Sequence, residues 1–234
     1  MANLTDSLYA IKVCVFDKRI ITLEELCKAL ENDFENQEAL RLYLMNKIPK
    51  YGNDSPEIDN LFSEISEHIA TECRKYGDGD IRLIPSVFCW EKHELFGRET
   101  GATPDGRKAG FPLGDGSGPC QGREFAGPTA SILSSTKWDH SKFIGGVAVN
   151  MKFSKSSLGK NSVNTMKSLV KAYLNRGGFE IQINVTDKEI LQKAMVNPEE
   201  YRDLIVRIGG YSNYFVRLSP NMQKEIILRT EHEI

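Results

Sequence analysis

Apolar residues recur at helical spacing through the first third of the chain. Positions 4, 8, 11 and 15 are apolar and a polar break follows at residues 17–19, which predicts a first helix. Thr22, with Glu25 three residues later, has the spacing of a capping box at the start of a second helix. Similar patterns predict helices over residues 37–47 and 55–69. We interpret these apolar faces as core contacts between helices.

The pattern changes after residue 80. Residues 81–90 are rich in β-branched and aromatic side chains, which predicts a strand that Pro85 interrupts. Residues 95–128 then carry a glycine or proline every few positions, too many for a helix or a regular strand. A loop of this length is usually functional or disordered. Its apolar side chains, such as Phe111 and Phe125, favour an ordered loop that packs on the rest of the domain.

The last third alternates between strand and helix patterns. The predicted elements, in chain order, are a helix from 127, a strand at 146–153, a helix at 163–174, a strand at 179–185, helices at 187–195 and from 197, a strand at 204–206 and a helix at 219–229. Such alternation is typical of an α/β layer or barrel, and it predicts an α/β fold class.

Composition excludes several classes of protein. The 234 residues are enough to bury a core, and 40% hydrophobic residues, 26% charged residues and a net charge of −2 fit a globular protein. Lys and Arg form no basic stripe, which argues against a nucleic-acid partner. No apolar run reaches the roughly 18 residues of a membrane span, and no secretory signal is visible. The sequence therefore predicts a cytoplasmic protein without membrane association.

The cysteines and histidines show no ligand pattern. The five cysteines are odd in number and widely spaced, with no CxxC pair and no Cys/His set, which indicates reduced thiols rather than disulfides or a metal site. His93, His140 and His232 stand alone in the sequence. We expect them to be solvated or satisfied in the core rather than catalytic.

The glycine pair Gly209-Gly210 lies between a predicted strand and an aromatic residue. Taken alone it predicts a turn, because glycine tolerates positive φ. Its neighbours suggest more. Residues 201–215 resemble the signature of the glycyl radical enzymes, an Arg-Val-x-Gly-Tyr core followed by a Phe. Arg207, Gly210, Tyr211 and Phe215 match this pattern, and an isoleucine replaces the valine.

Further segments resemble the same family in the expected order. They are residues 4–11, 101–110, 127–130 and 223–232, so the resemblance covers essentially the whole chain. The run Thr103 to Arg107 and the Thr-Glu-His ending look more like the dehydratase, decarboxylase and C–N lyase branches than like pyruvate formate-lyase. The resemblance implies the later portion of a ten-stranded α/β barrel with flanking helices and a central glycine-radical loop. Residues 1–95 would be the helical and first-strand part of that barrel, and residues 96–234 the glycine radical domain.

The resemblance also implies a chemistry. Gly210 would store a Cα radical, with Arg207, Tyr211 and Phe215 shaping the loop. A separate activating enzyme, which uses S-adenosylmethionine and an iron–sulfur cluster, would remove the hydrogen atom, so no bound cofactor or metal is expected. The radical would then generate a thiyl radical that starts C–C, C–O or C–N cleavage of a small-molecule substrate, of the dehydratase, lyase or formate acetyltransferase type.

The family's catalytic cysteine lies on a loop ahead of the region that matches here. Cys14, Cys27 and Cys73 fit buried or structural thiols, while Cys89, in a predicted strand, and Cys120, in the glycine-rich stretch, lack the family's cysteine-loop context. We therefore expect a larger subunit or remainder to carry the cysteine, and no turnover by this chain alone.

Several alternatives stay open. The chain could be a subunit of a split enzyme, a replacement radical domain, or a truncated product without activity; its start just before a family-like helix favours a split or a break in the gene. It could also be a non-catalytic interaction module that binds a larger partner. Gly210 separates these classes, because a binding module should tolerate Gly210→Ala and a radical carrier should not.

Overall fold

The computed structural model describes residues 1–76, 80–88, 92–156, 158–229 and 231–232. Its α-helices are α1 (Ala2–Ile11), α2 (Leu23–Glu31), α3 (Glu38–Asn46), α4 (Pro56–Lys75), α5 (Lys92–Glu99), α6 (Gly127–Ser135), α7 (Ser162–Asn175), α8 (Lys188–Val196) and α9 (Pro220–Leu228). A π-helical segment, η1 (Lys12–Asp17), continues α1, and short 3₁₀ turns are η2 (His140–Lys142), η3 (Pro198–Tyr201) and η4 (Phe215–Arg217). The strands are β1 (Ala148–Phe153), β2 (Glu180–Val185), β3 (Ile205–Arg207), β4 (Ser212–Tyr214) and β5 (Glu231–His232).

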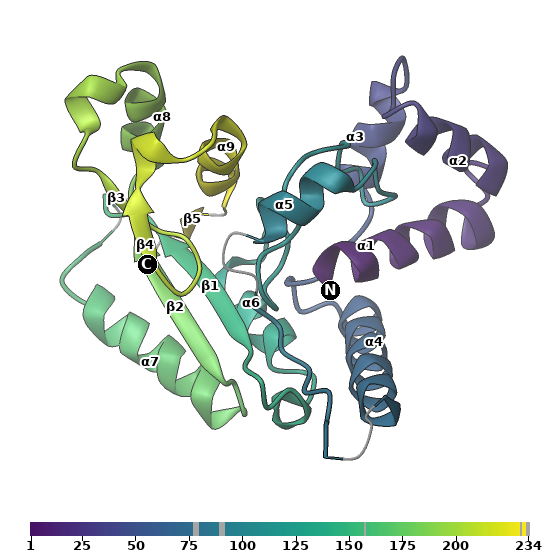
Figure 1. Cartoon of the computed structure of the whole chain (residues 1–234), viewed down its shortest axis with the longest axis horizontal. Helices are drawn as coiled ribbons and strands as arrows, with labels where there is room; N and C mark the ends of the chain where they lie inside the picture. Colours follow the sequence, from purple (N-terminus) through teal and green to yellow (C-terminus); the bar gives the residue numbers. More distant parts are fainter. Residues whose placement is uncertain (77–79, 89–91, 157, 230, 233–234) are drawn as a thin grey trace.

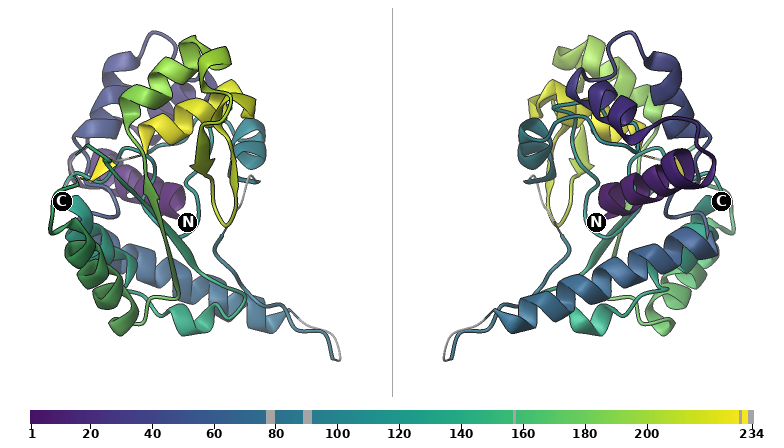
Figure 2. Two further views of the ribbon diagram at one scale, coloured as in Figure 1. Left: turned by 90° about the vertical axis from the view of Figure 1, so that its left-hand side faces the viewer. Right: turned by 90° about the vertical axis from the view of Figure 1, so that its right-hand side faces the viewer.

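Helices α1 to α4 form one side of the molecule and the sheet forms the other (Figure 1). The predicted capping box is confirmed: Thr22 Oγ1 accepts from the backbone N–H of Glu25, and the Glu25 carboxylate accepts from the N–H of Thr22. Helices α8 and α9 lie at the opposite end of the molecule from the long helix α4 (Figure 2).

An aromatic cluster joins α4 to the segment after α6. The rings of Tyr51 and Phe62 stack with centroids 3.9 Å apart, and Trp138 lies 5.5 Å from Phe62. Phe143 meets Trp138 edge-on at 5.1 Å. These rings belong to one buried cluster that also contains Val147, next to β1. The helical side and the sheet side therefore share a hydrophobic core.

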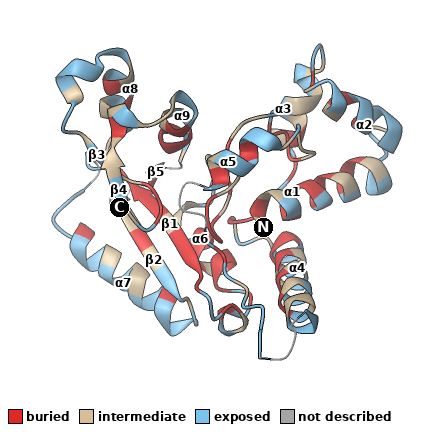
Figure 3. Cartoon of the chain, viewed as in Figure 1, coloured by how far each residue is buried: buried red, intermediate tan, exposed pale blue. Residues whose placement is uncertain are grey.

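The interpretation of the first apolar stripe as core is wrong for Leu4 and Leu8, whereas Ile11 and Val15 are partly buried and pack against the first cluster. Leu4 and Leu8 are 48% and 41% exposed, whereas Thr5, Asp6 and Ala10 are buried. Figure 3 shows both buried and exposed residues along α1. The reason is that α1 presents its small and polar side to the interior, where the Asp6 carboxylate accepts from the backbone N–H of Tyr51 at 2.8 Å.

The main sheet is parallel, with strand order β2-β1-β5. β1 and β2 pair over six residues, from Ala148 with Glu180 to Phe153 with Val185, and α7 is the crossover between them. Val149, Met151 and Phe153 pack with α6 and α7 in a second buried cluster, together with Ile181 and Ile183 of β2. Because side chains alternate along a strand, the residues between these face the other side of the sheet.

The second sheet is the antiparallel hairpin β3–β4, in which Ile205 pairs with Tyr214 and Arg207 with Ser212. The sequence predicted a strand here but not its partner β4. The hairpin packs on α8 and α9 through a third buried cluster that includes Ile208, Phe215 and Ile226.

Two predictions near the middle of the chain are wrong in part. Of residues 81–88, only Val87 makes a strand-like bridge, to Val147, and Ile81 and Ile84 are 67% and 56% exposed. The start of the predicted loop is helical, because α5 runs to Glu99 and includes Gly97. A Cβ at Gly97 would lie 2.3 Å from the carbonyl oxygen of Phe111, so this glycine permits a close backbone approach.

We expect Phe62→Ala to reduce the free energy of unfolding by roughly 3–5 kcal/mol, because it leaves a cavity in the aromatic cluster. Urea unfolding followed by circular dichroism measures this. Phe16→Ala is the matched control: its ring is 64% exposed, and the change should stay within about 0.5 kcal/mol. Equal losses from the two variants would contradict the assigned core.

Candidate functional site

The glycine pair forms the turn of the β3–β4 hairpin, which the N–H of Ile208 closes by donating to the carbonyl of Tyr211 at 2.9 Å. Gly210 has a φ of 84°, in the left-handed region that favours glycine. Gly209 lies close to a side chain, since a Cβ there would be 2.8 Å from Asp115 Oδ2. Gly209 is buried, whereas Gly210 is exposed.

Three side chains hold the backbone of this hairpin. The N–H of Gly210 donates to Gln182 Oε1 at 2.8 Å, and the N–H of Arg207 donates to Asn184 Oδ1 at 3.1 Å. Arg229, after the end of α9, donates from Nη1 to the carbonyl of Ile208 at 2.8 Å. Sequence reasoning missed these residues, although the alternating pattern of β2 already places Gln182 and Asn184 on the same face.

A buried charge cluster lies beneath the turn. Arg229 is 3.1 Å from Glu225 and 3.6 Å from Asp115, and His93 is 3.9 Å from each of these carboxylates. Burial raises the pKa of Asp115, an effect that His93 and Arg229 oppose. Burial also acts to lower the pKa of Arg229, but Glu225 and Asp115 outweigh it, so that this pKa is raised. His93 is therefore a core residue, as expected from the sequence.

His140 and His232 are also buried. His140 lies 2.7 Å from the carbonyl of Ser135 through Nε2, and its Nδ1 accepts from the N–H of Phe179 at 3.2 Å. His232 lies 3.4 Å from the carboxylate of Glu124. These contacts fit the expectation of histidines satisfied in the core.

A cavity of about 330 Å³ opens beside the turn. Its polar lining comes from the side chains of Asp115, Asn150, Glu180 and Gln182, and the backbone of Gly209 and Gly210 forms part of its wall. No cysteine within the described ranges lines it. The cavity brings an exposed glycine Cα next to hydrogen-bonding groups from β1 and β2.

The structure brings the other predicted loop residues into the same hairpin. Arg207 Nε donates to Gln182 Oε1 at 3.2 Å, the same oxygen that accepts from Gly210. Tyr211 packs at the edge of the third buried cluster, and Phe215 is fully buried in it. These contacts can hold the hairpin in place, and the roles of the three residues stay predictions.

The cysteines lie in different environments. Cys14 and Cys120 are buried and Cys73 is partly exposed. Cys27 is exposed, so the prediction of a buried thiol is wrong for it: the buried face of α2 carries Leu26 and Ala29 instead. Cys89 lies outside the described residues.

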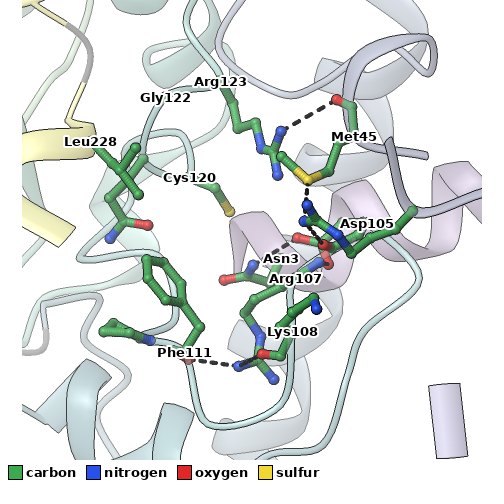
Figure 4. A pocket seen from close by; sticks show the side chains of 14 residues that line it. Asn3, Met45, Asp105, Arg107, Lys108, Phe111, Cys120, Gly122, Arg123 and Leu228 are labelled. Atoms are coloured by element: carbon green, nitrogen blue, oxygen red, sulfur yellow. Dashed lines mark hydrogen bonds between the residues drawn. The ribbon is translucent and has the colours of Figure 1, made fainter. Parts of the chain in front are cut away.

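Cys120 lines a second cavity, of about 370 Å³, between α1, α3 and the glycine-rich loop (Figure 4). In its wall, Asp105 Oδ2 accepts from Asn3 Nδ2 at 2.8 Å, which ties the loop to α1. Arg107 donates to the carbonyls of Gly101 and Phe111. The motif from Thr103 to Arg107 thus organises the loop and attaches it to the first helix.

Among the described residues, one group has ligand atoms close enough together to hold a metal ion. It consists of Asp6, Asp105 and Cys120, whose ligand atoms lie within 4.8 Å of one another. Burial raises the pKa of Asp6 to about 7, against the opposing effect of the Lys50 ammonium, and burial raises the pKa of the Cys120 thiol well above its usual value. Metals bind the deprotonated forms of these groups. The arrangement therefore favours a partly protonated structural cluster over a metal centre.

Two family models match the chain. The model described as Glycine radical matches residues 113–216, which contain the hairpin, and the model described as Pyruvate formate lyase-like matches residues 1–97. The chain belongs to the glycyl radical enzyme family. The recognition made from residues 201–215 is thereby confirmed.

Known glycyl radical enzymes match along the whole chain. This chain is 41% identical to trans-4-hydroxy-L-proline dehydratase of Clostridioides difficile, and the match covers 99% of this chain and 29% of that relative. It is 36% identical to isethionate sulfite-lyase of Bilophila wadsworthia, covering 100% of this chain and 28% of that relative. The structure of glycerol-bound B12-independent glycerol dehydratase from Clostridium butyricum has a TM-score of 0.92 and 44% identity, and the match covers 100% of this chain and 30% of that one.

The chain therefore spans about 30% of the length of these glycyl radical enzymes. The prediction of an α/β fold is confirmed, and this fold corresponds to part of the structure of these enzymes. The count of ten strands in the complete barrel stays a prediction. Within the described part of the chain, no helix is long and apolar enough to cross a bilayer.

The pKa of Asp6 predicts a pH-dependent stability. Because folding raises this pKa from 3.8 to about 7, the folded chain holds the proton to higher pH than the unfolded chain does. The free energy of unfolding should therefore fall as the pH rises from about 4 to about 7, by on the order of 4 kcal/mol in full.

Asp6→Asn keeps an oxygen acceptor for the N–H of Tyr51 but cannot ionise. Urea unfolding at pH 4 and at pH 7.5 should show a larger loss for the wild type than for this variant. Parallel pH dependence in the two proteins would contradict the assignment.

Proposed function

We propose that this chain is the radical-bearing part of a glycyl radical enzyme and that Gly210 stores the radical. The observation that carries the proposal is the geometry of the turn. Gly210 is exposed at the wall of a cavity, its backbone is held by Gln182, and its φ of 84° suits glycine. Gly209 is buried against Asp115, which supports Gly210 as the reactive glycine of the pair.

The chemistry requires glycine at this position. Loss of an α-hydrogen leaves a Cα radical that is shared between the amide nitrogen and the carbonyl, and this sharing needs a planar α-carbon. A side chain would crowd the planar centre and cover the face from which hydrogen is exchanged. A separate activating enzyme with S-adenosylmethionine and an iron–sulfur cluster would remove the hydrogen atom.

A thiol must then give a hydrogen atom to the Gly210 radical, which leaves a thiyl radical on the sulfur. Among the described cysteines, none of Cys14, Cys27, Cys73 and Cys120 lines the cavity beside Gly210. Cys89 lies outside the described residues, and its sequence lacks the family's cysteine-loop context. We therefore assign the thiyl function to a cysteine supplied by a further portion of the enzyme, either in the same polypeptide or in a partner. On this proposal, residues 1–234 alone do not turn over substrate.

The exposed apolar residues of α1 and η1 support such a further portion. Leu4, Leu8 and Phe16 are 48%, 41% and 64% exposed, and Phe179 at the rim of the cavity is 52% exposed. Leu4 and Leu8 are neighbours one turn apart on α1, and exposed apolar neighbours of this kind can mark a contact with another protein element. We propose that the cysteine-bearing portion covers them.

The reaction we propose is radical cleavage of a small molecule, of the dehydratase or lyase type rather than the formate acetyltransferase type. Two of the relatives support this choice, because one is named a dehydratase and the other a sulfite-lyase. Residues 1–95 would belong to the barrel and residues 96–234 to the glycine radical domain.

Anaerobic electron paramagnetic resonance tests the proposal. The chain is incubated with S-adenosylmethionine and an activating enzyme that is competent on a dehydratase of this family. We expect a doublet from coupling to the single remaining α-hydrogen, and its collapse to a singlet when the chain contains α-deuterated glycine.

Gly210→Ala should abolish this doublet. Gly177→Ala is the matched control, because Gly177 has a φ of 89° and a Cβ there would meet nothing within 4 Å, so the variant carries similar backbone strain away from the site. An unchanged doublet in Gly210→Ala would contradict the assignment. If the chain takes no radical from an activating enzyme that does activate its own dehydratase, the chain is a non-catalytic relic or an interaction module.

A further inference from the structure

The side-chain amide of Gln182 contacts Gly210, and the neighbours of this amide fix which of its ends faces the glycine. Its Oε1 accepts from the N–H of Gly210 at 2.8 Å and from Nε of Arg207 at 3.2 Å, and its Nε2 donates to Glu180 Oε1 at 2.8 Å. A carboxylate only accepts, and the other two groups only donate. A flipped amide would therefore lose all three hydrogen bonds.

The position of Gln182 is also well defined. Gln182 is buried, with 8% of the residue exposed. It stands in the middle of β2, where its Cα pairs with Asn150 of β1, and Asn150 donates to Asp115 at 2.8 Å. The acceptor for Gly210 is thus carried by a paired strand rather than by a loop.

We propose that Gln182 is a positioning residue that stabilises the radical on Gly210 through the amide N–H. This inference rests on the proposed function. The unpaired electron is shared with the lone pair of the glycine nitrogen, and an acceptor on the N–H increases the electron density of that nitrogen. The hydrogen bond also fixes the peptide plane before Gly210, on which the overlap depends. Glu180 polarises the Gln182 amide in the same direction.

Asn184 provides a comparison on the same strand. Its Oδ1 accepts from the N–H of Arg207 at 3.1 Å and its Nδ2 donates to the Arg207 carbonyl at 3.3 Å. It supports the hairpin with the same kind of amide contact. Its hydrogen bonds end at Arg207, three residues before the glycine that Gln182 binds.

The experiment compares the wild type with Gln182→Met, Gln182→Glu and Asn184→Leu after anaerobic activation, with [¹⁵N]glycine incorporated. Met has a similar length but no strong acceptor, and Glu retains an oxygen at the same reach. For Gln182→Met we expect a smaller ¹⁵N coupling, a larger α-hydrogen splitting and a radical half-life about five- to tenfold shorter, in line with the loss of one hydrogen bond. Gln182→Glu keeps the acceptor for Gly210 but loses the donation to Glu180, so it should recover only part of the half-life. Asn184→Leu should leave both couplings unchanged.

Amide hydrogen exchange of Gly210 in the unactivated chain is a second measurement that needs no radical. Faster exchange in Gln182→Met than in Asn184→Leu supports the assigned contact, provided that circular dichroism shows both variants folded. Wild-type couplings and half-life in Gln182→Met would overturn the inference while leaving Gly210 as the radical site. Equal changes of the couplings and the half-life in Gln182→Met and Asn184→Leu would mean that Gln182 only supports the hairpin. That result would also overturn the inference. A wild type that takes no radical would overturn the proposed function and this inference with it.

Discussion

The hairpin turn depends on one constraint: its backbone must be held firmly while one α-carbon stays uncovered. A side chain at Gly210 could have anchored the turn, but it would occupy the space that a reaction at this carbon needs. The structure meets the constraint from outside the turn, with Gln182 and Asn184 from β2 and Arg229 from the end of α9. Each contacts the backbone of the hairpin, so the exposed glycine is ordered without a side chain of its own.

These anchors link distant parts of the sequence. Arg229 contacts Asp115 and Glu225, and Glu225 accepts from Gln121 of the glycine-rich loop at 2.7 Å. The same loop reaches α1 through Asp105 and Asn3. Since buried charges are costly unless they are paired, the cluster under the turn forms only when these segments meet. The glycine-rich loop is therefore a connector between the first helix and the hairpin, which explains why it is ordered despite its length.

Much of this arrangement could be predicted from local patterns. The alternation of residues 179–185 predicts β2, and the spacing of Thr22 and Glu25 predicts the cap of α2. What local patterns could not supply are contacts set by tertiary structure. Strand β4 has no apolar alternation and forms because it pairs with β3, and Leu4 and Leu8 follow helical spacing although α1 buries its opposite side. The contact of Arg229 with Ile208 depends on how α9 returns to the hairpin.

The most direct test of the central claim is where oxygen cuts the activated chain. Air is admitted after anaerobic activation, and intact mass spectrometry identifies the fragments. A radical on Gly210 predicts one cut, with a small carboxy-terminal peptide that begins at Tyr211 or retains only a remnant of Gly210. A peptide that retains an intact Gly210 after a cut at Gly209, or an activated chain that oxygen leaves whole, would contradict the account.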